Sequence, residues 1–196
     1  LGFVVANAGD VNGDGFADII IGAPYADVPD PANPGQFLNE AGRVYVIYGK
    51  DDFSLDQPFN LNNLNGLNGF VINGLVANGR LGKSVAGVGD VNGDGRHDIA
   101  IVAPDSNAGQ GRGGVLCRAP EDAINGNGVV RLDLTGNQNM DGNAVDTFGA
   151  RGFRIEGFQD GARSGFAISA AGDVDGDGFA DIIVGTPFFD ANGAPN

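Results

Sequence analysis

The chain has 196 residues, a hydrophobic fraction of 42%, 35 glycines and a formal net charge of −14. The acidic balance disfavours nucleic acid as a partner, and the 11 basic residues form no patch. No apolar run approaches the ~20 residues of a membrane-spanning helix, so we expect no membrane insertion. The single cysteine, Cys117, excludes an intrachain disulfide, and we expect it to be a buried apolar residue.

The first feature in chain order is a nine-residue loop, residues 10–18, between two strand-like runs at 3–6 and 18–21. Oxygen-bearing side chains stand at loop positions 1, 3, 5 and 9, and glycines stand at positions 4 and 6. Calcium takes about 6–8 oxygen ligands, including backbone carbonyls, and glycine permits the tight backbone path. The pattern therefore predicts a β-hairpin whose loop binds calcium, with position 7 contributing its carbonyl.

The loop recurs at residues 90–98 and 173–181, at offsets of 80 and 163 residues from the first copy. An EF-hand is excluded, because its glutamate at position 12 is replaced by Ile21, Ile101 and Val184, which lie in β-branched runs. Polar turns without metal would explain one such loop. Three copies with the same oxygen pattern favour three calcium sites.

Each of the two complete repeats contains four strand candidates, which indicates the blade of a propeller. Beyond the hairpin strands, they lie at residues 43–48 and 69–72 in the first repeat and at 113–117 and 152–155 in the second. The prediction is an all-β chain forming a partial β-propeller of about two and a half four-stranded antiparallel blades. Blade 1 covers about 1–79, blade 2 about 80–162 and half of blade 3 about 163–196.

Three long insertions, residues 25–42, 50–68 and 118–151, interrupt the repeats. Loops of this length are usually functional or disordered. The third contains a candidate extra strand at 129–134 and a polar stretch at 141–143, either a turn or a weak oxygen site. A half blade leaves a sheet exposed. We therefore expect a fragment of a longer chain that can associate with itself through its open blade edges.

The phrase formed by Leu1-Gly2, the loop and Gly22-Ala23-Pro24 resembles the FG-GAP repeat of integrin α-subunits and their bacterial relatives. The resemblance implies a seven-bladed propeller with calcium loops on one face and a role in adhesion or partner binding. The departures, such as Ser164-Gly165 for Phe-Gly, leave the ligand positions unchanged. The implied ligands are Asp10, Asn12, Asp14, the Phe16 carbonyl and Asp18; Asp90, Asn92, Asp94, the Arg96 carbonyl and Asp98; and Asp173, Asp175, Asp177, the Phe179 carbonyl and Asp181.

Two function classes follow. The first is a non-enzymatic, calcium-binding extracellular or cell-surface module for adhesion to a protein or glycan ligand. The alternative is the accessory propeller of a secreted phospholipase or polysaccharide-active hydrolase. Catalysis within this chain is disfavoured, because its only histidine, His97, lies between ligand positions, and we expect its side chain to face solvent. Absent disulfides favour a bacterial relative, and the extra carboxylate of Asp175 predicts that the third loop binds calcium most tightly.

Overall fold

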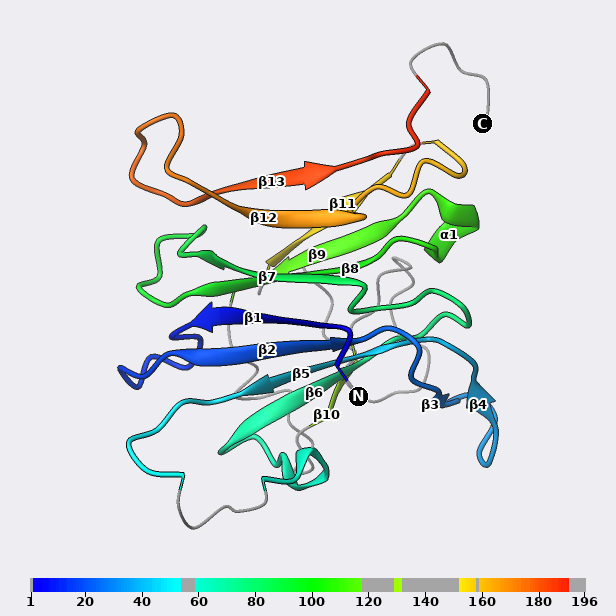
Figure 1. Ribbon diagram of the computed structural model, residues 1–196, viewed down its shortest axis with the longest axis horizontal. Coiled ribbons are helices and arrows are strands. Elements are labelled where there is room, and N and C mark those ends of the chain that lie inside the picture. The colour runs from blue at the N-terminus through cyan, green and yellow to red at the C-terminus, as the bar shows by residue number, and fades with distance from the viewer. Residues whose placement is uncertain (1, 54–58, 118–128, 132–151, 158, 191–196) are drawn as a thin grey trace.

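The computed structural model describes residues 2–53, 59–117, 129–131, 152–157 and 159–190, and its strands form stacked sheets (Figure 1). Blade 1 contains β1 (Val4–Gly9), β2 (Asp18–Ala23), β5 (Arg43–Ile47) and β6 (Gly69–Asn73). Blade 2 contains β7 (Ser84–Gly89), β8 (Asp98–Ala103), β9 (Arg112–Leu116) and β11 (Gly152–Glu156). The partial blade 3 contains β12 (Ala167–Gly172) and β13 (Asp181–Gly185). The predicted all-β partial propeller is confirmed.

The strands of each blade run antiparallel in a repeated order. In blade 1, Ala6 of β1 lies opposite Ile20 of β2, Ile20 opposite Val46 of β5, and Val46 opposite Phe70 of β6. Blade 2 repeats this order as β7, β8, β9 and β11. The β-branched residues of these strands suit a pleated, packed surface. Burial alternates along much of β2 but is complete along β8, because blade 2 lies between two other blades.

The insertions add small elements to this framework. β3 (Val28–Pro29) and β4 (Phe37–Leu38) form a hairpin, and residues Leu61–Asn63 form a 3-10 helix. A short helix outside the insertions, α1 (Ser106–Gly109), lies between β8 and β9. β10 (Val129–Arg131) pairs in parallel with β6, so the extra strand is confirmed for residues 129–131. The rest of that prediction and the stretch at 141–143 lie outside the described residues. Within the described part of the chain, no helix has the length and apolar character needed to cross a membrane.

The hydrophobic core lies between the blades. One buried cluster joins Ile20, Val46 and Phe70 of blade 1 to Ile99 and Leu116 of blade 2. A second cluster joins blade 2 to blade 3 and includes Cys117, which is buried as predicted. Burial of such side chains stabilises each blade by about 1.5–3 kcal/mol per large aliphatic residue. The stack of blades is therefore the source of the fold's stability.

Backbone hydrogen bonds also fasten each blade to the one before it. The Leu81 N–H donates to the Ala41 carbonyl at 2.9 Å, and the Ser164 N–H donates to the Gln110 carbonyl at 2.9 Å. Beside these bonds, Gly42 has φ +87°, and a Cβ there would collide with the Leu81 carbonyl oxygen. The first residues of a blade are thus held by a turn of the preceding blade.

Candidate metal centres

The three predicted loops lie at the same end of the stacked blades, at the left in Figure 1. They connect β1 to β2, β7 to β8 and β12 to β13. Each hairpin has a shift in strand register just before its loop. The shift lies between Asn7 and Gly9 in blade 1 and at the equivalent positions in blades 2 and 3. The shift ends each first strand with a glycine of positive φ, +74° at Gly9, which turns the chain out of the sheet.

The aspartate at loop position 1 organises the backbone of its loop. Asp10 Oδ1 accepts hydrogen bonds from the Gly13 N–H at 2.7 Å and the Asp14 N–H at 3.0 Å, and Oδ2 accepts from the Gly15 N–H at 2.9 Å. Asp90 and Asp173 accept the same three bonds in their loops. The two glycines adopt positive φ in every copy, +79° and +92° in the first. The repeated sequence therefore produces one repeated loop conformation.

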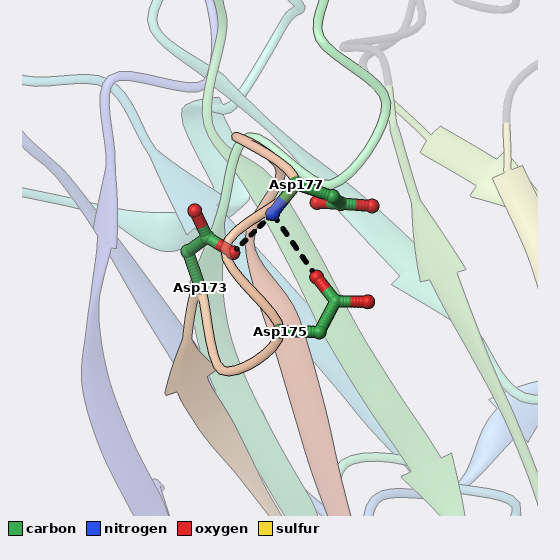
Figure 2. Close-up of side chains that lie close together, drawn as sticks. All are labelled: Asp173, Asp175 and Asp177. Carbon is green, nitrogen blue, oxygen red and sulfur yellow. Dashed lines mark hydrogen bonds between the residues drawn. The ribbon is translucent and has the colours of Figure 1, made fainter.

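The third loop gathers three carboxylates at its surface (Figure 2). Asp173, Asp175 and Asp177 each offer an oxygen, and these oxygens lie within 4.8 Å of one another. The Asp177 N–H donates to Asp173 Oδ1 and Asp175 Oδ1, both at 3.1 Å, which holds the three side chains on one side of the loop. Three exposed anions at this spacing repel one another, and a hard cation with oxygen ligands would relieve the repulsion. The donor set fits calcium.

The other two loops carry an amide at position 3. The Asn12 amide donates to Asp14 Oδ2 at 2.7 Å, and the Asn92 amide donates to Asp94 Oδ2 at 3.2 Å. The Asp175 carboxylate has no N–H to donate, so it cannot form the corresponding bond to the carboxylate of Asp177. The three loops share a backbone path but differ in the negative charge that they present.

The aspartate at position 9 is an anchor inside the fold. Asp18 Oδ2 accepts from the Val11 N–H at 2.8 Å, and Oδ1 accepts from the Gly49 N–H at 2.7 Å, beyond the end of β5. Its side chain is buried, and burial raises its pKa. Asp181 makes the corresponding bond from the Val174 N–H at 2.7 Å. Asp18 thereby ties its loop to the blade, and the remaining lone pairs of both carboxylates can still ligate a cation.

Asp98 differs from Asp18 in one bond. Its Oδ2 accepts from the Val91 N–H at 2.7 Å, but its buried Oδ1 has no hydrogen-bond partner assigned among the described residues. Burial raises the pKa of Asp98 to about 6, and the charges of Asp94 and Asp90 add to the effect. The neighbouring Cys117 thiol has its pKa raised to about 12 by its own burial and by the charge of Asp98. The lone pairs of this buried carboxylate oxygen could ligate a cation.

The loops of successive blades are hydrogen-bonded to each other. The His97 N–H donates to the Asp10 carbonyl at 2.9 Å, and the Ala180 N–H donates to the Asp90 carbonyl at 3.0 Å. His97 is exposed as expected, but its Nδ1 also accepts from the Asp10 N–H at 3.1 Å. The Phe179 ring lies over Gly93, where an added Cβ would come within 2.5 Å of it. The three candidate sites therefore form one connected column.

Sequence reasoning missed these contacts between loops. His97 and Phe179 occupy loop positions 8 and 7, where the ligand pattern places no demand on the side chain. Gly49 was missed as the partner of Asp18, since no motif marks it. The signal that could have found His97 is its difference from Ala17 and Ala180 at the same position.

The fold and the loops define the class of protein: a propeller built from repeats, each with an oxygen-rich hairpin loop. The FG-GAP repeat model matches residues 2–47, 82–116 and 164–196, and the chain belongs to this family. It is 32% identical over 206 residues to phosphatidylinositol-glycan-specific phospholipase D of Rattus norvegicus, covering 98% of this chain and 19% of that protein. It is 30% identical over 178 residues to integrin alpha-IIb of Homo sapiens, covering 90% of this chain and 14% of that protein.

A third relative is integrin alpha-PS5 of Drosophila melanogaster, 27% identical over 181 residues, which cover 92% of this chain. The chain spans less than a fifth of the length of each of these relatives. The predicted resemblance to integrin α-subunits is confirmed as homology. The matched segments include all three candidate loops.

The raised pKa of Asp98 predicts how pH affects the metal-free protein. A group whose pKa is higher in the folded state, here about 6 against a usual 3.8, binds its proton more tightly when folded. Its stabilising contribution is complete below pH 3.8 and is lost as pH rises through about 6. We expect the urea midpoint of dialysed, metal-free protein to rise between pH 7 and pH 5. A midpoint that falls over this range would contradict the assignment.

Proposed function

We propose that this chain is a calcium-binding, non-enzymatic module of an integrin-like propeller, in which calcium holds the hairpin loop of each blade. The observation that carries the proposal is the loop conformation repeated three times, with the carboxylate cluster of Asp173, Asp175 and Asp177 in the third copy. The residues that would hold calcium are the aspartates and asparagines at positions 1, 3, 5 and 9, with the carbonyl at position 7. Bound calcium would neutralise the carboxylates.

The module would act outside the cell or at its surface, where calcium is abundant enough to fill exposed loops. Its ligand would be a protein or a glycan, bound at the end of the blades that carries the loops or at the long insertions. Homology to integrin α-subunits supports this assignment. Rigid loops supported by a stacked scaffold are a common arrangement for recognition.

The chemistry of the described residues supports a non-enzymatic role. Cys117 is buried, and its pKa of about 12 keeps the thiol protonated at neutral pH. His97 Nδ1 accepts a hydrogen bond from the Asp10 N–H, so only the other ring nitrogen can contact solvent. The carboxylate beside Cys117 is Asp98, and its negative charge disfavours the thiolate that a nucleophilic cysteine needs.

The second candidate is an accessory propeller of a secreted hydrolase. The observation that favours it is the match of nearly the whole chain to phosphatidylinositol-glycan-specific phospholipase D. In this case the propeller would still bind calcium, but its ligand would be the substrate or a second domain of the enzyme. Turnover of lipid or glycan substrates by the purified chain would reject the non-enzymatic assignment.

Isothermal titration calorimetry tests both the metal and the order of affinities. We expect saturable calcium binding, with the tightest step assigned to the third loop because it presents four carboxylates instead of three. Asp175→Asn converts its position 3 to the residue of the other loops and should weaken that step at least about tenfold. The matched control is Asp51→Asn, an exposed aspartate outside the loops, which should leave the titration unchanged.

Two results would contradict the proposal. Absence of calcium binding at millimolar metal would reject the loops as calcium sites. Unchanged tightest affinity in the Asp175→Asn variant would reject the assignment of that step to the third loop.

A further inference from the structure

The hairpin loops contact one another through the peptide group between positions 7 and 8. The loops are named in chain order: loop 1 is residues 10–18, loop 2 is 90–98 and loop 3 is 173–181. The N–H of this peptide group donates to the carbonyl at position 1 of the preceding loop. The bond is 2.9 Å long from His97 to Asp10 and 3.0 Å long from Ala180 to Asp90. Loops 2 and 3 therefore each bond to the loop before them.

The same peptide group would serve two metal sites. Its carbonyl, at position 7, is the backbone ligand that the proposed function assigns to its own loop, while its N–H bonds to the neighbouring loop. A trans peptide is planar and rigid, and its carbonyl and N–H point to opposite sides. Because the His97 N–H points at loop 1, the Arg96 carbonyl points away from it. Fixing the Arg96 carbonyl as a ligand would thus also fix the His97 N–H.

The side chain of His97 makes a second bond to the same residue of loop 1. Its Nδ1 accepts from the Asp10 N–H at 3.1 Å, so both backbone polar groups of Asp10 are bonded to one residue of loop 2. The ring packs on Gly9, where an added Cβ would collide with Nδ1. The other loops have alanine at this position, Ala17 and Ala180, which offers no side-chain acceptor. Loop 2 therefore holds loop 1 by one bond more than loop 3 can hold loop 2.

Asp10 is the residue through which this contact reaches the metal site of loop 1. Its carboxylate accepts the N–H groups of Gly13, Asp14 and Gly15, which define the backbone path of the loop. Arg96 adds a contact, since a Cβ added at Gly13 would lie 3.1 Å from Arg96 Nε. A residue that fixes the backbone of Asp10 therefore positions the ligand around which loop 1 is arranged.

The strands beneath the loops are already packed together. A Cβ added at Gly87 of β7 would lie 2.8 Å from Ala8 Cα of β1, so the two backbones meet just below loops 1 and 2. Ala8 is completely buried, and so is Val88. The exposed residues are those of the loops themselves, 13–17 and 92–95. Metal binding would therefore order the loops on a base that is already fixed.

We propose that His97 positions Asp10 for calcium binding, so that calcium bound in loop 2 raises the calcium affinity of loop 1. The inference rests on the proposed calcium binding. A loop that is already held in its bound conformation loses less conformational freedom on binding, and its affinity rises. Coupling between two sites is reciprocal, so occupation of loop 1 raises the affinity of loop 2 by the same factor. His97 acts as a positioning residue, because its side chain bonds to Asp10 and not to the metal.

Electrostatic effects between the loops can be separated from this coupling by salt. Repulsion between two bound cations, and attraction of a cation by the carboxylates of a neighbouring loop, both act through solvent around exposed loops. Such interactions are largely screened in about 1 M salt, where the Debye length is ~3 Å. The hydrogen bonds between His97 and Asp10 join adjacent groups directly. The coupling should therefore persist at high salt.

Calcium titration followed by two-dimensional amide NMR tests the coupling, because each loop reports through its own glycine N–H. Asp94→Ala blocks loop 2 at an exposed ligand position. We expect it to raise the calcium midpoint of the Gly13 signal about fivefold or more, in low salt and in high salt. The matched control is Asp177→Ala, the same change in loop 3. It should shift the Gly13 midpoint by less than about twofold, since loop 3 bonds to loop 2 and not to loop 1.

Variants of His97 test its role directly. His97→Ala should raise the Gly13 midpoint about threefold or more and leave that of Gly176 in loop 3 unchanged. His97→Asn should restore the wild-type midpoint, because its side-chain oxygen can accept from the Asp10 N–H. In the His97→Ala background, Asp94→Ala should have a smaller effect on loop 1 than in the wild type. A role in folding alone would not produce this non-additivity, and all variants are checked for wild-type spectra away from the loops.

Three results would overturn the inference. An unchanged Gly13 midpoint in Asp94→Ala, with calcium still binding to loop 1, would reject the coupling and leave the proposed function intact. An effect of Asp94→Ala that disappears in high salt, or that is equal with and without His97, would reject the contact as its cause. Loop glycine signals that do not respond to millimolar calcium would reject the calcium sites, and the coupling with them.

Discussion

Replacing Asp98 by asparagine should stabilise the metal-free protein and destabilise the calcium-loaded one. Without metal, the buried carboxylate has a pKa of about 6, a shift that corresponds to about 3 kcal/mol of unfavourable burial at neutral pH. An amide keeps the bond from the Val91 N–H and removes the charge, so we expect a net gain of about 1–2 kcal/mol after the amide's own burial cost. With calcium, loss of a charged ligand should weaken that site at least about tenfold.

The matched control is Asp18→Asn in the first loop. Asp18 uses both oxygens to accept buried N–H groups, from Val11 and Gly49, and an asparagine has only one acceptor oxygen. This variant should therefore lose stability in the absence of metal as well as in its presence. Urea denaturation of both variants, with calcium and with excess chelator, measures all four values. A loss of stability for Asp98→Asn in chelator would contradict the account of its orphaned oxygen.

Substitution of Gly42 by alanine should destabilise the chain by about 3 kcal/mol or more. Gly42 has φ +87°, and an added Cβ would collide with the backbone of Leu81, where blade 2 is fastened to blade 1. Backbone atoms cannot swing aside as a side chain does, so the two blades must separate locally. Thermal denaturation monitored by circular dichroism measures the loss.

Gly35→Ala separates the steric effect from the backbone strain. Gly35 has nearly the same φ, +89°, but no atom lies within 4 Å of its added Cβ. It carries only the strain of alanine at positive φ, about 1 kcal/mol. Equal losses for the two variants would mean that strain alone accounts for Gly42, and that the contact with Leu81 contributes nothing.

The sequence was sufficient to predict the principal strands of each blade, because periodicity and the repeated loop specify them locally, whereas the short strands β3 and β4 were not predicted. The run of Ile19, Ile20 and Ile21 between a polar loop and a proline turn has few alternatives to a packed strand. The positions of the candidate ligands followed from the same repeat. The register shift at Gly9, which directly precedes the loop, was not predicted.

The relations between repeats could not be predicted, since they depend on how the blades stack. Asp18 and Asp98 occupy the same motif position and are both buried, yet their hydrogen-bond partners set them apart. Likewise, the insertion after β5 reads as a polar loop, and only the fold shows that Leu64 packs against Ile47. β10 pairs with a strand of another repeat, a contact between residues 129–131 and 71–73 that no local pattern encodes.

Hydrogen bonds join Leu81 to Ala41 and Ser164 to Gln110, so the first residues of each repeat are bonded to the repeat before it. The segments that unfold cooperatively therefore do not coincide with the sequence repeats. A segment that opens as a unit would include the end of one repeat and the first residues of the next. In amide hydrogen exchange, the N–H groups of Leu81 and Ser164 should then share the protection of the blade before them. The repeat boundary seen in the sequence would then differ from the boundary between segments of different opening free energy. Coupling between neighbouring repeats, which is common in repeat proteins, has this effect.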